Sequence, residues 1–143
     1  MRTSSKGINL IKEFEGIQLQ KYRDSVGKWT IGVGHLILPN ESFDKGITEN
    51  QAIDLLIKDL TRVEIFINSY VTHHNLDLNQ NEFDCFASFA FNLGVGSLDQ
   101  LLSHGLNNVP IEILKWNHAG GVVSPGLSRR RQAELALFNA ISN

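Results

Sequence analysis

The chain has 143 residues, of which 42% are hydrophobic and 20% charged, as in a globular domain that buries a self-supporting core. A formal net charge of −2 gives no sign of nucleic-acid binding, and a single cysteine, Cys85, excludes an intrachain disulfide. No apolar run approaches the roughly 20 residues of a membrane span, so we expect no membrane insertion. The N-terminal segment lacks the apolar core of a signal peptide, which predicts synthesis and folding in the cytoplasm.

The first predicted helix begins near the capping residues Ser4 and Ser5 and ends before Gly16. Apolar residues at helical spacing supply the face that packs against the rest of the domain. Glu15 therefore lies at the C-terminal end of a short helix, from which its side chain can reach into a cleft.

The period of the sequence changes to two over residues 29–34, where apolar residues alternate with threonine and glycine and predict a strand. A turn over residues 25–27 precedes it, so Asp24 and Thr30 flank the turn and could face each other across a hairpin. The apolar pattern indicates that Trp29 packs in a core, although a tryptophan could also stack on a sugar.

A polar loop over residues 39–46 leads to a long helix over residues 49–69, which begins at a capping box formed by Thr48 and Gln51. Apolar residues at helical spacing form a seam along this helix. Asp59 lies on that seam. Its carboxylate should therefore be partly buried, and a buried charge is costly unless it is paired.

A second capping box, formed by Asn79 and Glu82, begins a helix that ends near Gly94. Aromatic residues cover nearly all faces of this helix, so we expect it to be buried, with Cys85 as a small core residue.

The remaining sequence predicts short helices over residues 98–103 and 110–119, a long turn over residues 120–126 and a last helix over residues 128–141. Helices thus account for most of the chain, and the predicted sheet is confined to its N-terminal part. The elements together predict an α+β fold.

Glu15, Asp24 and Thr30 are the candidate groups for chemistry. Glycoside hydrolysis needs an acid that protonates the leaving oxygen, and a second polar group that positions water or meets the positive charge developing on the sugar. A glutamate at a helix end and an aspartate at a hairpin can line opposite walls of a cleft, and a threonine hydroxyl can hold a water. These residue types alone do not identify an enzyme, because any 30 residues contain a pair of acids.

The stretch EFEGIQLQKYRDSVGKWTIGVGH closely resembles the T4-type phage lysozyme family, glycoside hydrolase family 24. The signature of that family is a glutamate, eight residues, an aspartate or cysteine, five residues and a threonine, which is the spacing of Glu15, Asp24 and Thr30. The resemblance continues through LNQNEFDCFASFAFNLGVG and KWNHAGGVVSPGLSRRRQAELALF, and therefore covers nearly the whole chain. It is greatest to the soluble endolysins of lambdoid phages.

The resemblance implies one lysozyme domain over residues 1–143, with an active-site cleft between two lobes. The small sheet-containing lobe would span about residues 16–48 and the connecting helix about residues 49–69. The helical lobe would span about residues 70–143 and include the N-terminal helix. Over residues 96–116 the chain looks shorter than the family, which puts sugar contacts from that region in doubt.

The resemblance also implies roles for individual residues. Glu15 would be the general acid, Asp24 would stabilise charge or activate water, and Thr30 would position that water. Asn92 would face the sugar, unless it serves only to end its helix. One of the arginines at positions 129–131 would approach the catalytic glutamate, but three adjacent residues on a helix point in three directions.

The implied protein is a monomeric endolysin that uses neither a metal nor a cofactor. It would hydrolyse the β-1,4 bond between N-acetylmuramic acid and N-acetylglucosamine in bacterial peptidoglycan and so lyse the host cell. A lytic transglycosylase would use the same glutamate without needing Asp24 and Thr30, and a non-catalytic peptidoglycan-binding module would need none of the three. An enzyme that folds in the host cytoplasm would need a holin or another membrane permeabiliser to reach the periplasm and cell wall.

The predicted partner of Asp59 is His35, which ends the TIGVGH segment and has no other evident role. The resemblance points the same way, since the family places an aspartate on this helix near that histidine. The alternative is a rotated helix that leaves Asp59 in water. If the pair exists, it raises the pKa of His35 and stabilises the fold most in mildly acidic solution.

Overall fold

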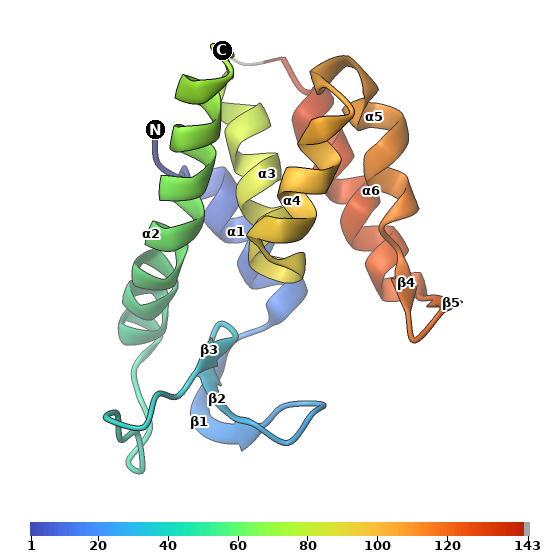
Figure 1. Cartoon of the computed structure of the whole chain (residues 1–143). Coiled ribbons are helices and arrows are strands. Elements are labelled where there is room, and N and C mark those ends of the chain that lie inside the picture. The colour runs from blue at the N-terminus through green and yellow to red at the C-terminus, as the bar shows by residue number, and fades with distance from the viewer. Residues whose placement is uncertain (142–143) are drawn as a thin grey trace.

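The computed structural model describes residues 1–141, in which a three-stranded antiparallel sheet lies at one end of a group of helices (Figure 1). This arrangement confirms the predicted α+β fold. The elements run in the order α1 (Ser5–Glu15), β1 (Gln18–Arg23), β2 (Trp29–Gly32), β3 (His35–Leu36), α2 (Glu49–His73), α3 (Gln80–Leu93), α4 (Val95–Ser103), α5 (Val109–Glu112), β4 (His118–Ala119), β5 (Val122–Val123) and α6 (Pro125–Asn139).

Both predicted capping boxes are present and begin the two central helices. At α2, the Thr48 hydroxyl accepts the N–H of Gln51 at 3.1 Å, and the Gln51 side chain accepts the N–H of Thr48 at 2.8 Å. At α3, Asn79 and Glu82 make the same two bonds at 2.8 and 3.0 Å. These reciprocal bonds satisfy backbone donors that the start of a helix otherwise leaves without a partner.

Helix α3 forms the centre of the molecule and contacts α1, α2, α4 and α6. Phe83, Phe86, Phe89 and Cys85 are fully buried on it, which confirms the predicted buried helix and the core position of the cysteine. Helix α3 is thus packed against other helices along most of its length, and its C-terminal residues 91–93 are partly exposed.

Strand β2 pairs with β1 and β3, and the register sets Tyr22 opposite Thr30 and Arg23 opposite Trp29. The predicted core position of Trp29 is wrong, because this side chain is 42% exposed. Its ring lies against two cations, with Lys21 Nζ at 4.7 Å and Arg23 Cζ at 4.4 Å from a ring centroid. A strand with one buried face should alternate buried and exposed residues. This strand does not, because the three residues that follow Trp29 are all buried.

The segment after α4 differs from the prediction. The helix predicted over residues 110–119 ends at Lys115 as a short α-helix followed by a 3₁₀ turn. Residues 118–123 instead form the β4–β5 hairpin, in which Gly120 and Gly121 both adopt positive φ. Glycine adopts this conformation without a steric cost, so the pair favours a tight turn over a helix end.

The last helix begins three residues earlier than predicted, at Pro125. The Ser124 hydroxyl accepts the N–H of Leu127 at 3.2 Å and caps α6. Proline suits the first turn because its missing N–H would have had no helical partner there. Ser124 and Pro125 therefore start a helix, where the sequence had predicted a turn.

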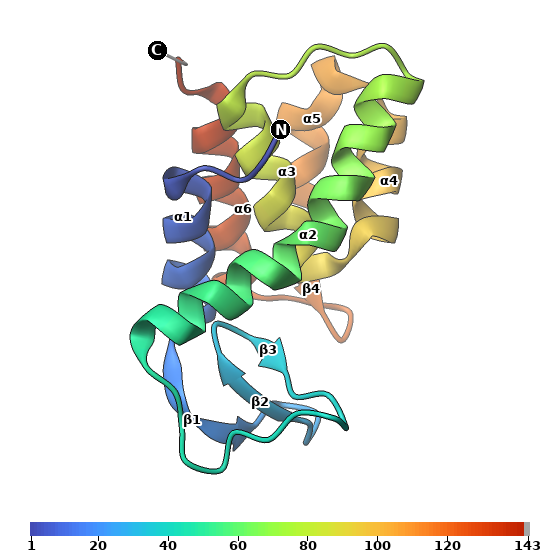
Figure 2. The same ribbon diagram turned by 90° about the vertical axis from the view of Figure 1, so that its left-hand side faces the viewer.

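Helix α2 connects the sheet to the other helices. In Figures 1 and 2 it starts beside the sheet and runs to the far end of the helical part, and it contacts all three strands as well as α3. It extends beyond its predicted end, to His73. Among residues 1–141, no helix has both the length and the apolar character needed to cross a membrane. The division into two lobes stays a prediction.

Candidate active site

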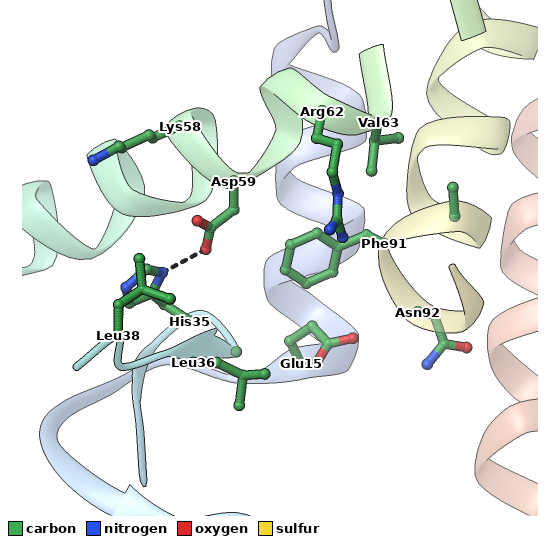
Figure 3. Close-up of a pocket in the computed structure, with 12 residues that line it drawn as sticks. Glu15, His35, Leu36, Leu38, Lys58, Asp59, Arg62, Val63, Phe91 and Asn92 are labelled. Atoms are coloured by element: carbon green, nitrogen blue, oxygen red, sulfur yellow. Dashed lines mark hydrogen bonds and ion pairs between the residues drawn. The ribbon is translucent and has the colours of Figure 1, made fainter. Parts of the chain in front are cut away.

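A groove of about 490 Å³ opens where the sheet, α2 and the C-terminal end of α3 meet (Figure 3). Four of the predicted site residues line it: Glu15 from α1, His35 from β3, Asp59 from α2 and Asn92 from α3. The sequence had placed these residues on separate elements, and the fold brings them to one cavity. The other lining residues are Gly34, Leu36, Leu38, Lys58, Arg62, Val63, Ala90 and Phe91.

Glu15 is held between the backbone of the sheet and an arginine of α6. It is the last residue of α1, which ends because Gly16 turns the chain with a φ of +75°. A Cβ added at Gly34 would lie only 3.1 Å from Glu15 Oε1. On the other side, Arg130 donates a hydrogen bond from Nη1 to Glu15 Oε2. The carboxylate is thus fixed in position while its side chain stays 22% exposed.

Arg130 is therefore the arginine, of the three adjacent candidates, that reaches Glu15. Its neighbour Arg131 reaches a different site residue, because its Nη2 donates to Asn92 Oδ1 at 2.7 Å. Arg129 is exposed. Each of the two buried arginines thus holds one polar residue of the groove.

Glu134, one turn further along α6, lies between both arginines. Its Oε2 accepts Arg130 Nε at 3.3 Å and Arg131 Nη2 at 3.2 Å, and its Oε1 forms an ion pair with Arg131 Nε at 2.7 Å. Ser88 of α3 donates its hydroxyl to the same Oε2 at 2.5 Å. Glu134 was not predicted from the sequence, although its spacing of three and four residues from the arginines is the helical signal for ion pairs.

These charges are removed from water. Glu134 and Arg131 are fully buried, and Arg130 is 4% exposed. Burial raises the pKa of Glu134 and lowers the pKa of Arg131, because a nonpolar environment disfavours each charged form. The attraction between the two groups opposes both shifts.

Asp24 and Thr30 are not among the residues that line the groove. Asp24 folds back on its own turn, where Oδ1 accepts the N–H groups of Val26 at 3.0 Å and Lys28 at 2.8 Å. Thr30 is 3% exposed and donates its hydroxyl to the carbonyl of Lys28 at 3.0 Å. They do not form a pair across the hairpin, because Thr30 lies opposite Tyr22.

Tyr22 lies opposite Thr30 in the sheet. Partial burial raises the pKa of its phenol, and the negative charges of Glu15 and Asp24 raise it further. This tyrosine was not among the candidate residues predicted from the sequence.

His35 contacts Asp59 as the sequence predicted, with Nδ1 at 2.7 Å from Asp59 Oδ2 (Figure 3). It has a second partner that the sequence analysis missed, since Nε2 lies 2.9 Å from Glu41 Oε1. Burial alone would lower the pKa of His35, but the hydrogen bonds and charges of the two carboxylates raise it above its usual value. This cluster ties β3 and the following loop to α2.

Comparisons with known proteins agree with this architecture. Residues 12–134 match the Phage lysozyme family. The chain is 40% identical to the endolysin of Salmonella phage P22 over 147 residues, which are 96% of this chain and 98% of that protein. It is 38% identical to the endolysin of Bacillus phage PZA over 151 residues, but it spans only 56% of that protein's length.

Among solved structures, the muramidase domain of SpmX from Asticaccaulis excentricus matches with a TM-score of 0.84 and 30% identity. The match covers 98% of this chain and 99% of that domain. Because the family match extends over most of the sequence, and the relative from phage P22 is matched over nearly its whole length, the chain belongs to the phage lysozyme family.

Proposed function

We propose that this protein is a muramidase that hydrolyses the β-1,4 bond between N-acetylmuramic acid and N-acetylglucosamine in bacterial peptidoglycan. The observation that carries the proposal is the position of Glu15, whose carboxyl group faces an open groove while Arg130 and the backbone at Gly34 fix its orientation. The names of its relatives, which are endolysins and a muramidase domain, support the same activity.

In the proposed reaction Glu15, in its protonated form, donates a proton to the glycosidic oxygen as the bond to the leaving sugar breaks. On the opposite side of the sugar, Asp24 would stabilise the developing positive charge or activate a water that Thr30 holds. As the glycosidic bond breaks, the oxygen of that water would bond to the anomeric carbon, and its proton would pass to Asp24 or to solvent. Inversion at the anomeric carbon needs the two carboxyl groups about 6.5–9.5 Å apart to admit that water. The hydrogen bonds within the turn at Asp24 would keep its carboxylate in place.

Asn92 is proposed as a sugar-binding residue. It lines the same groove as Glu15, and Arg131 holds its side-chain oxygen. That contact directs the oxygen toward α6 and leaves the amide nitrogen as the group available to a sugar oxygen.

Mass analysis of fragments released from purified peptidoglycan tests the proposal. Hydrolysis would give free reducing ends on N-acetylmuramic acid. Products with 1,6-anhydro ends would instead identify a lytic transglycosylase, in which the sugar's own hydroxyl replaces water. Binding to peptidoglycan without any fragment release would identify a non-catalytic module.

The release of the protein from the host cytoplasm by a holin or another membrane permeabiliser stays a prediction, as does its monomeric state. Expression in intact Gram-negative cells, followed by separation of cytoplasmic and periplasmic fractions, tests the first. The protein should reach the periplasm only when a membrane permeabiliser is co-expressed. Appearance there in its absence would contradict the prediction.

A further inference from the structure

Glu134 lies at the centre of the charge network behind the groove, in contact with Arg130, Arg131 and Ser88. Glu134 is fully buried in α6 and is not among the residues that line the groove. Its carboxylate nevertheless contacts Arg130 and Arg131, which hydrogen-bond to the groove residues Glu15 and Asn92. A buried ion of this kind is costly, because its removal from water must be offset by ion pairs and hydrogen bonds of good geometry.

Each arginine uses one edge for Glu134 and another for a residue of the groove. Arg130 contacts Glu134 through Nε and Glu15 through Nη1. Arg131 contacts Glu134 through Nε and Nη2, and the same Nη2 also reaches Asn92. A guanidinium group is planar and rigid, so fixing one edge also fixes the direction of the others.

A second set of contacts prevents the network from rotating. Ser88 donates to Glu134 Oε2 at 2.5 Å, and its carbonyl accepts Arg130 Nη2 at 3.1 Å. The guanidinium carbon of Arg131 lies 4.9 Å from the ring centroid of Phe89, which is itself buried. Helix α3 thus supports the orientation that the contacts with Glu134 give to both arginines.

We propose that Glu134 is a positioning residue for glycan cleavage. It orients Glu15 through Arg130. It orients Asn92 through Arg131. One buried carboxylate therefore aligns the proton donor and the proposed sugar-binding residue at once. This inference rests on the proposed function, because it assigns Glu134 a part in that reaction.

Glu134→Gln tests the inference, since it removes the charge and keeps the shape. Misplacement of a catalytic group by about 1 Å can cost about 100-fold in rate, so we expect kcat per folded molecule to fall roughly 10- to 100-fold. The assay measures release of reducing ends from soluble peptidoglycan fragments at a temperature where circular dichroism shows the variant to be folded.

Asp84→Asn is the matched control. Asp84 is also a fully buried carboxylate, but its partners are the N–H and the hydroxyl of Ser4 and the side chain of Gln80, and it does not line the groove. This control should lower the melting temperature and leave kcat within twofold of wild type. Equal kcat values for the folded forms of both variants would overturn the inference, because a merely structural residue changes stability alone.

Ser88→Ala provides a second test if Glu134→Gln does not fold. It keeps every buried charge and removes the hydroxyl that donates to Glu134 Oε2 at 2.5 Å and accepts more weakly from Arg130 Nη2 at 3.4 Å. We expect kcat to fall at least threefold, and a wild-type kcat would overturn the inference. Failure of the proposed function is a different result, because wild-type protein would then release no reducing ends at all.

Discussion

His35 is held between two carboxylates, and this contact limits the pH range in which it stabilises the fold. Its folded pKa is raised, so its contribution is complete below the unfolded value of about 6.5 and is lost as pH rises through the raised folded value. Burial would raise the pKa of Glu41, but the N–H of Leu38 and the contact with His35 hold it below the usual value. Its contribution is therefore lost as pH falls through that lowered value. The cluster should stabilise most in mildly acidic solution.

We predict that His35→Asn and Asp59→Asn each lower the free energy of unfolding most near pH 5–6 and least at alkaline pH. Removing one partner of a fully buried pair costs about 3–5 kcal/mol, and the loss should be smaller here because the Asp59 side chain is 28% exposed. The double variant should cost little more than either single one. Urea unfolding across pH measures this, with Asp54→Asn, an exposed position on α2, as the control. Additive losses that do not vary with pH would contradict the prediction.

Some residue contacts were predictable from the sequence and others were not. The pair of His35 and Asp59 was predicted because a carboxylate on an apolar seam needs a partner. Glu41 was missed because it lies in an irregular loop, where no periodicity indicates direction. The sequence did not predict which of the three arginines contacts Glu15. That depends on how α6 is rotated about its axis relative to Glu15, which is set by tertiary packing.

The turn between β2 and β3 places the backbone of Gly34 close to the carboxyl group of Glu15. Gly34 has a φ of +64°, and a Cβ there would lie 3.1 Å from Glu15 Oε1. We predict that Gly34→Ala loses about 1–2 kcal/mol of stability through backbone strain, and also loses activity because the carboxyl group is displaced. Chemical denaturation and a peptidoglycan-clearing assay measure the two effects.

Gly120, in the β4–β5 hairpin, supplies the control for that experiment. Its φ is +59°, but a Cβ there would meet nothing within 4 Å, and it does not line the groove. Gly120→Ala should therefore show a similar loss of stability with near wild-type activity. If the two alanine variants clear peptidoglycan equally well, the turn does not position Glu15.

At the scale of elements, the sequence predicted best where side chains make local bonds. Both capping boxes were confirmed, because the two partners lie three residues apart and no tertiary contact is needed. The β4–β5 hairpin was missed because its strands have two residues each, too few for a periodic pattern. The exposure of Trp29 could not be predicted either. Tertiary packing buries the rest of β2 and leaves the side chain of Trp29 in contact with water.

Chemical labelling of the single cysteine can report on unfolding of the whole molecule. Cys85 is fully buried in α3, and burial, followed by the charge of Glu134, raises its thiol pKa well above the usual value. A thiol must be exposed and ionised to react. We therefore predict that a thiol-specific reagent labels Cys85 only when the domain unfolds globally, so the rate should rise with urea in parallel with unfolding. Rapid labelling of the native protein, well before unfolding begins, would show that α3 opens locally.

We propose above all that Glu15 donates the proton that allows the glycosidic bond to break. Glu15→Gln keeps the size of the side chain and removes the acid, and general acid catalysis contributes about 10²–10⁴-fold. The matched control is Glu13→Gln, which alters an exposed glutamate on the same helix. The deciding measurement is the rate at which each folded variant releases reducing ends from purified peptidoglycan. We predict a loss of at least 100-fold for Glu15→Gln and none for Glu13→Gln. A Glu15→Gln variant that cleaves at nearly the wild-type rate would contradict the claim.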